Sequence, residues 1–118
     1  MKKYTKCAGL CFLLIIGPLL AFAEVRTMGK AWWETSRQSS GISPNPDEVI
    51  EAVIQVFAAR AFSWRGILGV HTWISVKPTN ASEYTVYQLV GGRLRRGEDA
   101  IVIQRDIPDR LWYDAVPE

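Results

Sequence analysis

The sequence predicts an α+β domain that is mainly β, in which a four-stranded antiparallel meander follows an N-terminal signal or anchor helix and irregular arms. Three observations carry this prediction. Residues 53–60 are rich in β-branched and aromatic side chains, residues 67–77 alternate with a period of two, and the candidate strands are joined by short connections. Parallel neighbours need crossovers of a dozen or more residues, so connections this short favour antiparallel pairing.

The first two strands are predicted over residues 53–60 and 67–77, with a turn at Ser63-Trp-Arg-Gly66 between them. Successive side chains of a strand point to opposite faces, so the second strand divides into two sets. The more aliphatic set is predicted to face the core: Leu68, Val70, Thr72, Ile74 and Val76. The other set is predicted to face away: Gly69, His71, Trp73, Ser75 and Lys77.

The third and fourth strands are predicted over residues 84–90 and 100–105, with a basic tip at residues 93–96 between them. A single sheet must cover its apolar face to be stable. The segments expected to cover it are the arm, through Trp32 and Trp33, and the C-terminal tail, through Trp112 and Tyr113.

Residues 1–23 have the composition of a secretory signal peptide. Lys2, Lys3 and Lys6 precede an uncharged run over residues 7–23, which ends in the small residues of Ala21-Phe-Ala23. The alternative is an uncleaved membrane anchor, although this run spans only about 25 Å as a helix against a hydrocarbon core of roughly 30 Å. Both alternatives predict an exported protein, either periplasmic or anchored in the inner membrane and facing the periplasm. The cell membrane is a partner only if the segment is retained.

The remaining chain is predicted to consist of an irregular arm over residues 24–46 and a β-rich domain over residues 47–118. The chain has 14 basic and 12 acidic residues, but three of the lysines belong to the leader. The exported part therefore lacks the positive field that nucleic-acid binding requires. Both cysteines, Cys7 and Cys11, also lie in the leader, and His71 is the single histidine. A zinc site of His and Cys ligands cannot form within one chain, so no metal or cofactor is expected.

His71 is the candidate catalytic residue. A histidine titrates near neutral pH and can act as a general base. Without a cysteine in the exported part, it requires a serine, a threonine or water as nucleophile. The simpler interpretation is a hydrogen-bonded imidazole on a half-covered sheet face.

The candidate binding residues form two groups. Arg93, Arg95 and Arg96 can clamp a phosphate or carboxylate, because guanidinium groups bind such anions in a bidentate manner. Trp64 and Trp73 can form an aromatic binding surface. Charged loop tips are otherwise solvated, and tryptophans otherwise pack in a core.

Several strings of this sequence resemble the bacterial domain of unknown function 3750 family. They run from Ala58-Ala-Arg-Ala-Phe-Ser-Trp-Arg-Gly66 through Val70-His-Thr-Trp-Ile-Ser-Val-Lys-Pro78 to Tyr84-Thr-Val-Tyr87, and the segment Asp106-Ile-Pro-Asp-Arg-Leu-Trp112 adds a fourth. The resemblance covers about residues 33–118. It implies an exported or membrane-anchored envelope protein, and it implies a further helical segment beyond Glu118, so that this chain is expected to be a truncated member.

The histidine-bearing strand is also similar, more loosely, to circularly permuted papain-like amidases and acyltransferases. In those proteins the nucleophile follows the histidine and lies on a later helix. This similarity implies that His71 is the general base and that its nucleophile lies outside this chain.

Two functions are therefore predicted from the sequence. The first is an exported, envelope-associated binding or structural domain without completed catalytic machinery, whose partner is a protein, the missing C-terminal segment or a small molecule of unknown identity. The second is a permuted papain-like hydrolase or acyltransferase that uses His71. Fold similarity alone does not carry an enzymatic assignment.

Overall fold

The computed structural model describes residues 9–12, 14–20 and 27–118. Residues 9–12 and 14–20 are helical, whereas the predicted cleavage point after Ala23 lies outside the described residues. None of the helices in the described ranges has the length and apolar character needed to cross a membrane.

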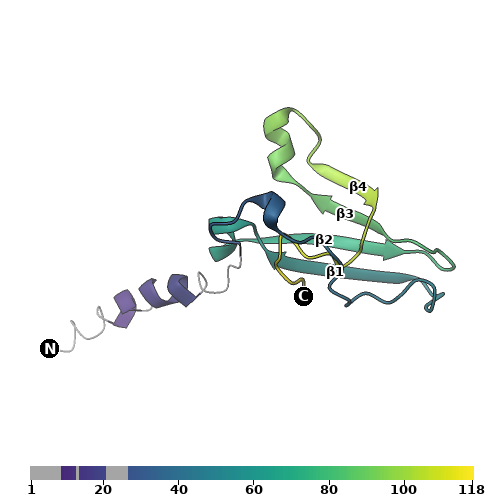
Figure 1. The fold of residues 1–118 in the computed structure, drawn as a ribbon, viewed down its shortest axis with the longest axis horizontal. Helices are drawn as coiled ribbons and strands as arrows, with labels where there is room; N and C mark the ends of the chain where they lie inside the picture. The colour runs from purple at the N-terminus through teal and green to yellow at the C-terminus, as the bar shows by residue number, and fades with distance from the viewer. Residues whose placement is uncertain (1–8, 13, 21–26) are drawn as a thin grey trace.

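The prediction of a mainly β fold with a four-stranded antiparallel sheet is confirmed. Strands β1 (Val53–Arg60), β2 (Val70–Lys77), β3 (Thr85–Leu89) and β4 (Ile101–Arg105) lie side by side in chain order, and each pairs antiparallel with the next (Figure 1). Three short 3-10 helices accompany them: η1 (Trp32–Glu34), η2 (Ser63–Ile67) and η3 (Gly91–Arg96).

Strand β2 begins three residues later than the period-two pattern predicts. The carbonyl of Arg65 accepts hydrogen bonds from the amides of Leu68 and Gly69, at 3.4 and 2.8 Å, and these bonds close the end of η2. Because both amides are used in this local turn, the strand starts at Val70. The basic tip at residues 93–96 likewise forms part of η3.

The predicted core face of β2 is wrong, and the opposite face is the covered one. The inner face of the sheet carries the buried side chains Phe57, Ala59, Trp73, Ser75, Lys77 and Val86. On the outer face, Val70 is 59 % exposed and Ile74 is 43 % exposed, while Leu68, which precedes the strand, is 91 % exposed. The sequence predicts the alternation of side chains in β2 correctly, but it does not predict on which side of the sheet the covering segments lie.

The C-terminal tail, residues 106–118, determines which face is covered. The carbonyl of Pro108 accepts hydrogen bonds from Nε1 of Trp73 at 2.7 Å and from Oγ of Ser75 at 2.8 Å. Trp112 and Ala115 pack against the buried cluster around Trp73. The inner face thus buries polar atoms that have partners in the tail, whereas the aliphatic side chains of the outer face have no comparable cover among the described segments.

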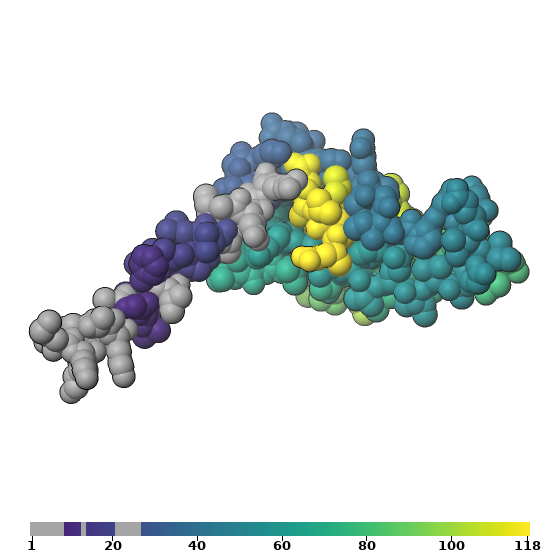
Figure 2. Space-filling model, turned by 90° about the horizontal axis from the view of Figure 1, so that it is seen from below, coloured from purple at the N-terminus to yellow at the C-terminus, as the bar shows by residue number. Residues whose placement is uncertain are grey.

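Both ends of the tail are also held by main-chain contacts. Glu118 exchanges two backbone hydrogen bonds with Ala58 on the free edge of β1, at 2.9 and 3.0 Å. Ser39 of the arm forms an isolated β-bridge with Arg110 of the tail. In the space-filling view the tail (yellow) lies next to arm residues (blue) on one side of the molecule (Figure 2).

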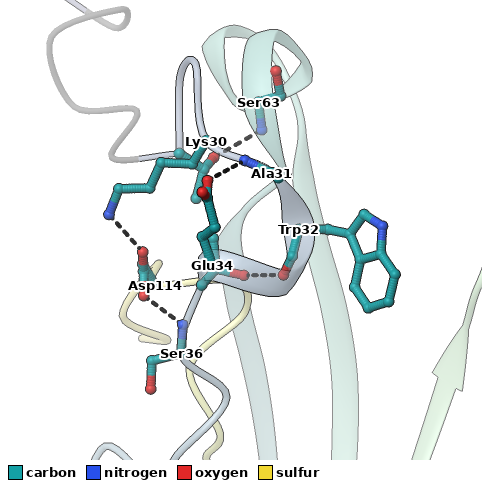
Figure 3. A network of polar contacts seen from close by, with 9 residues as sticks. Lys30, Ala31, Trp32, Glu34, Ser36, Ser63 and Asp114 are labelled. Atoms are coloured by element: carbon teal, nitrogen blue, oxygen red, sulfur yellow. Dashed lines mark hydrogen bonds and ion pairs between the residues drawn. The ribbon is translucent and has the colours of Figure 1, made fainter.

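The arm, described from residue 27 to residue 46, is irregular as predicted, but its tryptophans do not cover the sheet. Trp32 is 57 % exposed and Trp33 is 70 % exposed. Polar contacts hold the start of the arm instead: the carboxylate of Asp114 accepts a hydrogen bond from the Ser36 amide at 2.6 Å and pairs with Nζ of Lys30 at 2.9 Å (Figure 3). Trp32 points away from this network (Figure 3).

Candidate functional site

His71 lies on the inner face of β2 in an aromatic cluster. Its ring stacks on that of Trp112, with a centroid distance of 3.6 Å and an interplanar angle of 13°, and lies 5.7 Å from the ring of Trp73. Its Nε2 lies 3.1 Å from Oε1 of Gln88 on β3. A neutral imidazole that donates from Nε2 to this amide oxygen keeps Nδ1 unprotonated.

Burial lowers the pKa of His71, and the hydrogen bond to Gln88 opposes this effect only in part. The ring is therefore neutral at pH 7, the form in which a general base accepts a proton. In the part of the chain that the structure describes, no serine or threonine hydroxyl is hydrogen-bonded to the ring. The observed contacts of His71 are those of a packed and oriented side chain.

The two tryptophans expected to form an aromatic surface are placed differently. Trp73 is 3 % exposed and belongs to the core, whereas Trp64, in η2, is 63 % exposed. The guanidinium carbon of Arg65 lies 5.0 Å from the centroid of the Trp64 ring, within cation–π range. The structure therefore does not bring Trp64 and Trp73 into one exposed surface.

Two of the three arginines expected to clamp an anion are paired with an acidic side chain of their own loop. Glu98 forms ion pairs with Arg96 at 2.6 Å and with Arg93 at 3.2 Å. Arg93 also donates from Nε to the Asp99 carbonyl at 2.7 Å. Arg95 is exposed on the same short helix. The hydrogen bond from Arg96 lowers the pKa of Glu98 and so favours its charged form. The ionised Glu98 then offsets part of the positive charge of this loop.

The sequence did not indicate the role of the Asp109 carboxylate, a buried group that accepts several hydrogen bonds from the arm. The side chain is 1 % exposed and accepts hydrogen bonds from Oγ of Ser39 at 2.7 Å and from the amides of Ile42 and Ser43 at 2.6 and 2.9 Å. Burial alone raises the pKa of Asp109, but the hydrogen bonds from Ser43, Ser39 and Ile42 outweigh it, and the pKa is lowered. Asp109 thus stays ionised and holds the arm against the tail.

A cleft of about 610 Å³ lies where the arm, the tail and the start of β3 meet. Its lining includes Ser43 and Pro44 of the arm, Tyr84 before β3, and Ile107 of the tail. The Tyr84 hydroxyl donates to the Pro44 carbonyl at 2.9 Å and fixes one wall. The Ser43 hydroxyl oxygen is buried and has no hydrogen-bond partner within the described ranges. In the sequence, the pair Pro44 and Pro46 marks the arm side of this cleft, far from Pro108 on the tail side.

Comparison with known proteins locates the chain within one family. No curated protein and no solved structure matches it. A family model described as "Protein of unknown function (DUF3750)" matches residues 51–118, which include the whole sheet, η2, η3 and the tail. The match covers more than half of the chain and confirms the resemblance to this family found in the sequence. The chain therefore belongs to the DUF3750 family of proteins of unknown function.

Proposed function

We propose that this chain is an exported, envelope-associated binding domain whose cleft between arm and tail takes a neutral, hydrogen-bonding ligand. The leader composition of residues 1–23 supports export. The observation that carries the binding role is the cleft itself, because a concave site of about 610 Å³ with a few fixed polar groups is typical of small-molecule sites.

The polar groups of the cleft favour a ligand without net charge. Among its lining side chains, Arg105 pairs with Glu83 at 3.0 Å, and Asp106 pairs with Arg110 of the tail. The charges of these two pairs are thus compensated within the protein, and the ionised carboxylate of Asp109, which also lines the cleft, is 1 % exposed and hydrogen-bonded to the arm. The remaining lining combines proline and tyrosine surface with serine and asparagine side chains, which suits sugar hydroxyls and amides. In the envelope, the uncharged N-acetylated sugar units of the peptidoglycan glycan strand have this chemistry.

Filling the cleft is expected to abolish this binding. Ser82 lines the cleft and is exposed, so Ser82→Trp places a large ring in it without disturbing the core. Thr79→Trp adds the same ring at an exposed position outside the lining and is the matched control. In calorimetric titrations with a purified, uncharged N-acetylglucosamine oligosaccharide, wild type and Thr79→Trp should bind, and Ser82→Trp should bind at least about tenfold more weakly.

Two outcomes of this titration contradict the proposal. One is the absence of binding to the wild-type protein, and the other is equal binding by all three proteins. Conversion of the ligand during the titration, lost in His71→Ala, would instead favour the papain-like alternative, which the neutral imidazole of His71 supports.

Export is expected to remove the leader. Cleavage after Ala23 produces a protein that begins at Glu24, and intact mass spectrometry of the envelope-extracted chain measures this loss directly. An intact leader in the membrane fraction would establish the anchored form. Recovery of the uncleaved chain from the cytosol would contradict the proposal of export.

A further inference from the structure

We infer that two copies of this chain pack against each other through the outer face of the sheet. This inference does not depend on the proposed binding function, because none of the apolar residues of the outer face lines the cleft, which is formed mainly by the arm, the tail and residues 82–84. It rests on the arrangement, the extent and the charge of the outer face.

The outer face is an ordered apolar surface that crosses all four strands. Val56 is opposite Ile74, Ile74 is opposite Tyr87, and Tyr87 is opposite Ile103, so one row runs straight across the sheet. Four further large side chains flank this row: Ile54, Val70, Leu89 and Ile101. All eight are between 41 and 72 % exposed. A shallow open hollow of about 360 Å³ lies over the middle of this surface.

The extent of this face fits one half of a protein interface. Eight aliphatic and aromatic side chains at these exposures present roughly 500–800 Å² of apolar surface, and monomers rarely leave contiguous patches above ~300–600 Å² exposed. One partner of a standard interface contributes about 800 Å². Within residues 27–118, the arm and the tail are hydrogen-bonded to each other, and the tail is hydrogen-bonded to the inner face, so neither covers the outer face.

The charge distribution favours a second copy over a lipid surface or a charged partner. The charged strand residues on this face are Arg60 and Arg105, which lie at its margins opposite Val70 and Thr85. Arg60 donates to the Gly66 carbonyl at 3.2 Å, and Arg105 pairs with Glu83 at 3.0 Å. The row Val56, Ile74, Tyr87 and Ile103 carries no charge, so its two copies bring no like charges together when the face meets itself. Two such sheets can stack about 10 Å apart as a sandwich.

Association is expected to be lost when a charge is placed in the row. Val56 and Ile103 are 68 and 58 % exposed, so Val56→Arg and Ile103→Arg can be made without changing the inner core. Ile42, on the arm, is 48 % exposed, and Ile42→Arg is the control with the same added charge. In a two-fold pair each substitution enters the interface twice. Sedimentation of the purified whole chain over a concentration series should give a dimer for wild type and Ile42→Arg, and a dimer dissociation constant at least about tenfold higher for both row variants.

Three results would overturn the inference. These are a wild-type protein that stays monomeric throughout the series, a dimer that persists unchanged in both row variants, and a dimer that Ile42→Arg disrupts equally. Circular dichroism of each variant separates loss of association from loss of fold. Binding of the monomeric wild type to neutral phosphatidylcholine vesicles, lost in Val56→Arg, would assign the face to lipid and would also overturn it.

Discussion

Asp109→Asn is expected to lower the free energy of unfolding by about 3 kcal/mol, because three donors lose a charged acceptor in a buried position. The ionised carboxylate of Asp109 receives the Ser39 hydroxyl and the amides of Ile42 and Ser43. Asparagine has nearly the same shape, but it removes the negative charge and replaces one acceptor oxygen with an NH₂ group: if this group takes the place of Oδ2 it faces two N–H donors, and if it takes the place of Oδ1 the Ser39 hydroxyl must turn from donor to acceptor. Urea denaturation at pH 7, followed by tryptophan fluorescence, measures the difference.

Asp47→Asn is the matched control for this substitution. Asp47 is exposed, and the hydrogen bond at this residue uses its backbone amide, which the substitution retains. The control should change the free energy of unfolding by less than about 0.5 kcal/mol. Equal stability of wild type and Asp109→Asn would show that the carboxylate does not hold the arm against the tail.

The pH dependence of this difference has a definite sign. The folded-state pKa of Asp109 lies below its ordinary value, so the unfolded chain takes up the proton first as the pH falls. The stabilisation by Asp109 is fully present above a pH of about 4 and is lost as the pH falls through the folded-state pKa. The unfolding free energies of wild type and Asp109→Asn should therefore approach each other in acid.

The strands of this protein could be predicted because their signals are local. The β1 bounds, Val53–Arg60, agree with the sequence prediction, since a run of β-branched residues identifies a strand whatever packs on it. Alternation in β2 also placed His71 and Trp73 correctly on one face, where their rings lie 5.7 Å apart. Neither signal requires knowledge of distant residues.

The covered face and the candidate site could not be predicted, because both depend on contacts over long sequence separations. Ile74 belongs to a more aliphatic set than Trp73, so hydrophobicity alone favoured the wrong face. The covered face is determined by the Pro108 carbonyl, which accepts hydrogen bonds from the side chains of Trp73 and Ser75, more than thirty residues earlier in the chain. Asp109 likewise bonds Ser39 at a separation of 70 residues. No spacing rule within a single segment contains this information.

The second large effect is expected from Trp112, the side chain that links the tail to the aromatic cluster. Trp112→Ala removes the ring that stacks on His71 at 3.6 Å and packs against the cluster around Trp73. A half-buried ring of this size should stabilise the fold by about 2–4 kcal/mol. Trp33→Ala, at a residue that is 70 % exposed, removes an equal ring and should cost less than about 0.5 kcal/mol.

Trp112→Ala should also change the titration of His71, which distinguishes loss of this stack from a general loss of stability. In the wild type, burial holds the pKa of His71 below 6.5, so the unfolded chain binds a proton first and stability falls as the pH drops below about 6.5. Exposing one face of the ring should raise this pKa toward its ordinary value and flatten that part of the stability curve. His71 is the single histidine, so its ring protons report the pKa directly in an NMR titration under folding conditions. An unchanged His71 pKa in a folded Trp112→Ala protein would show that Trp112 does not bury the imidazole.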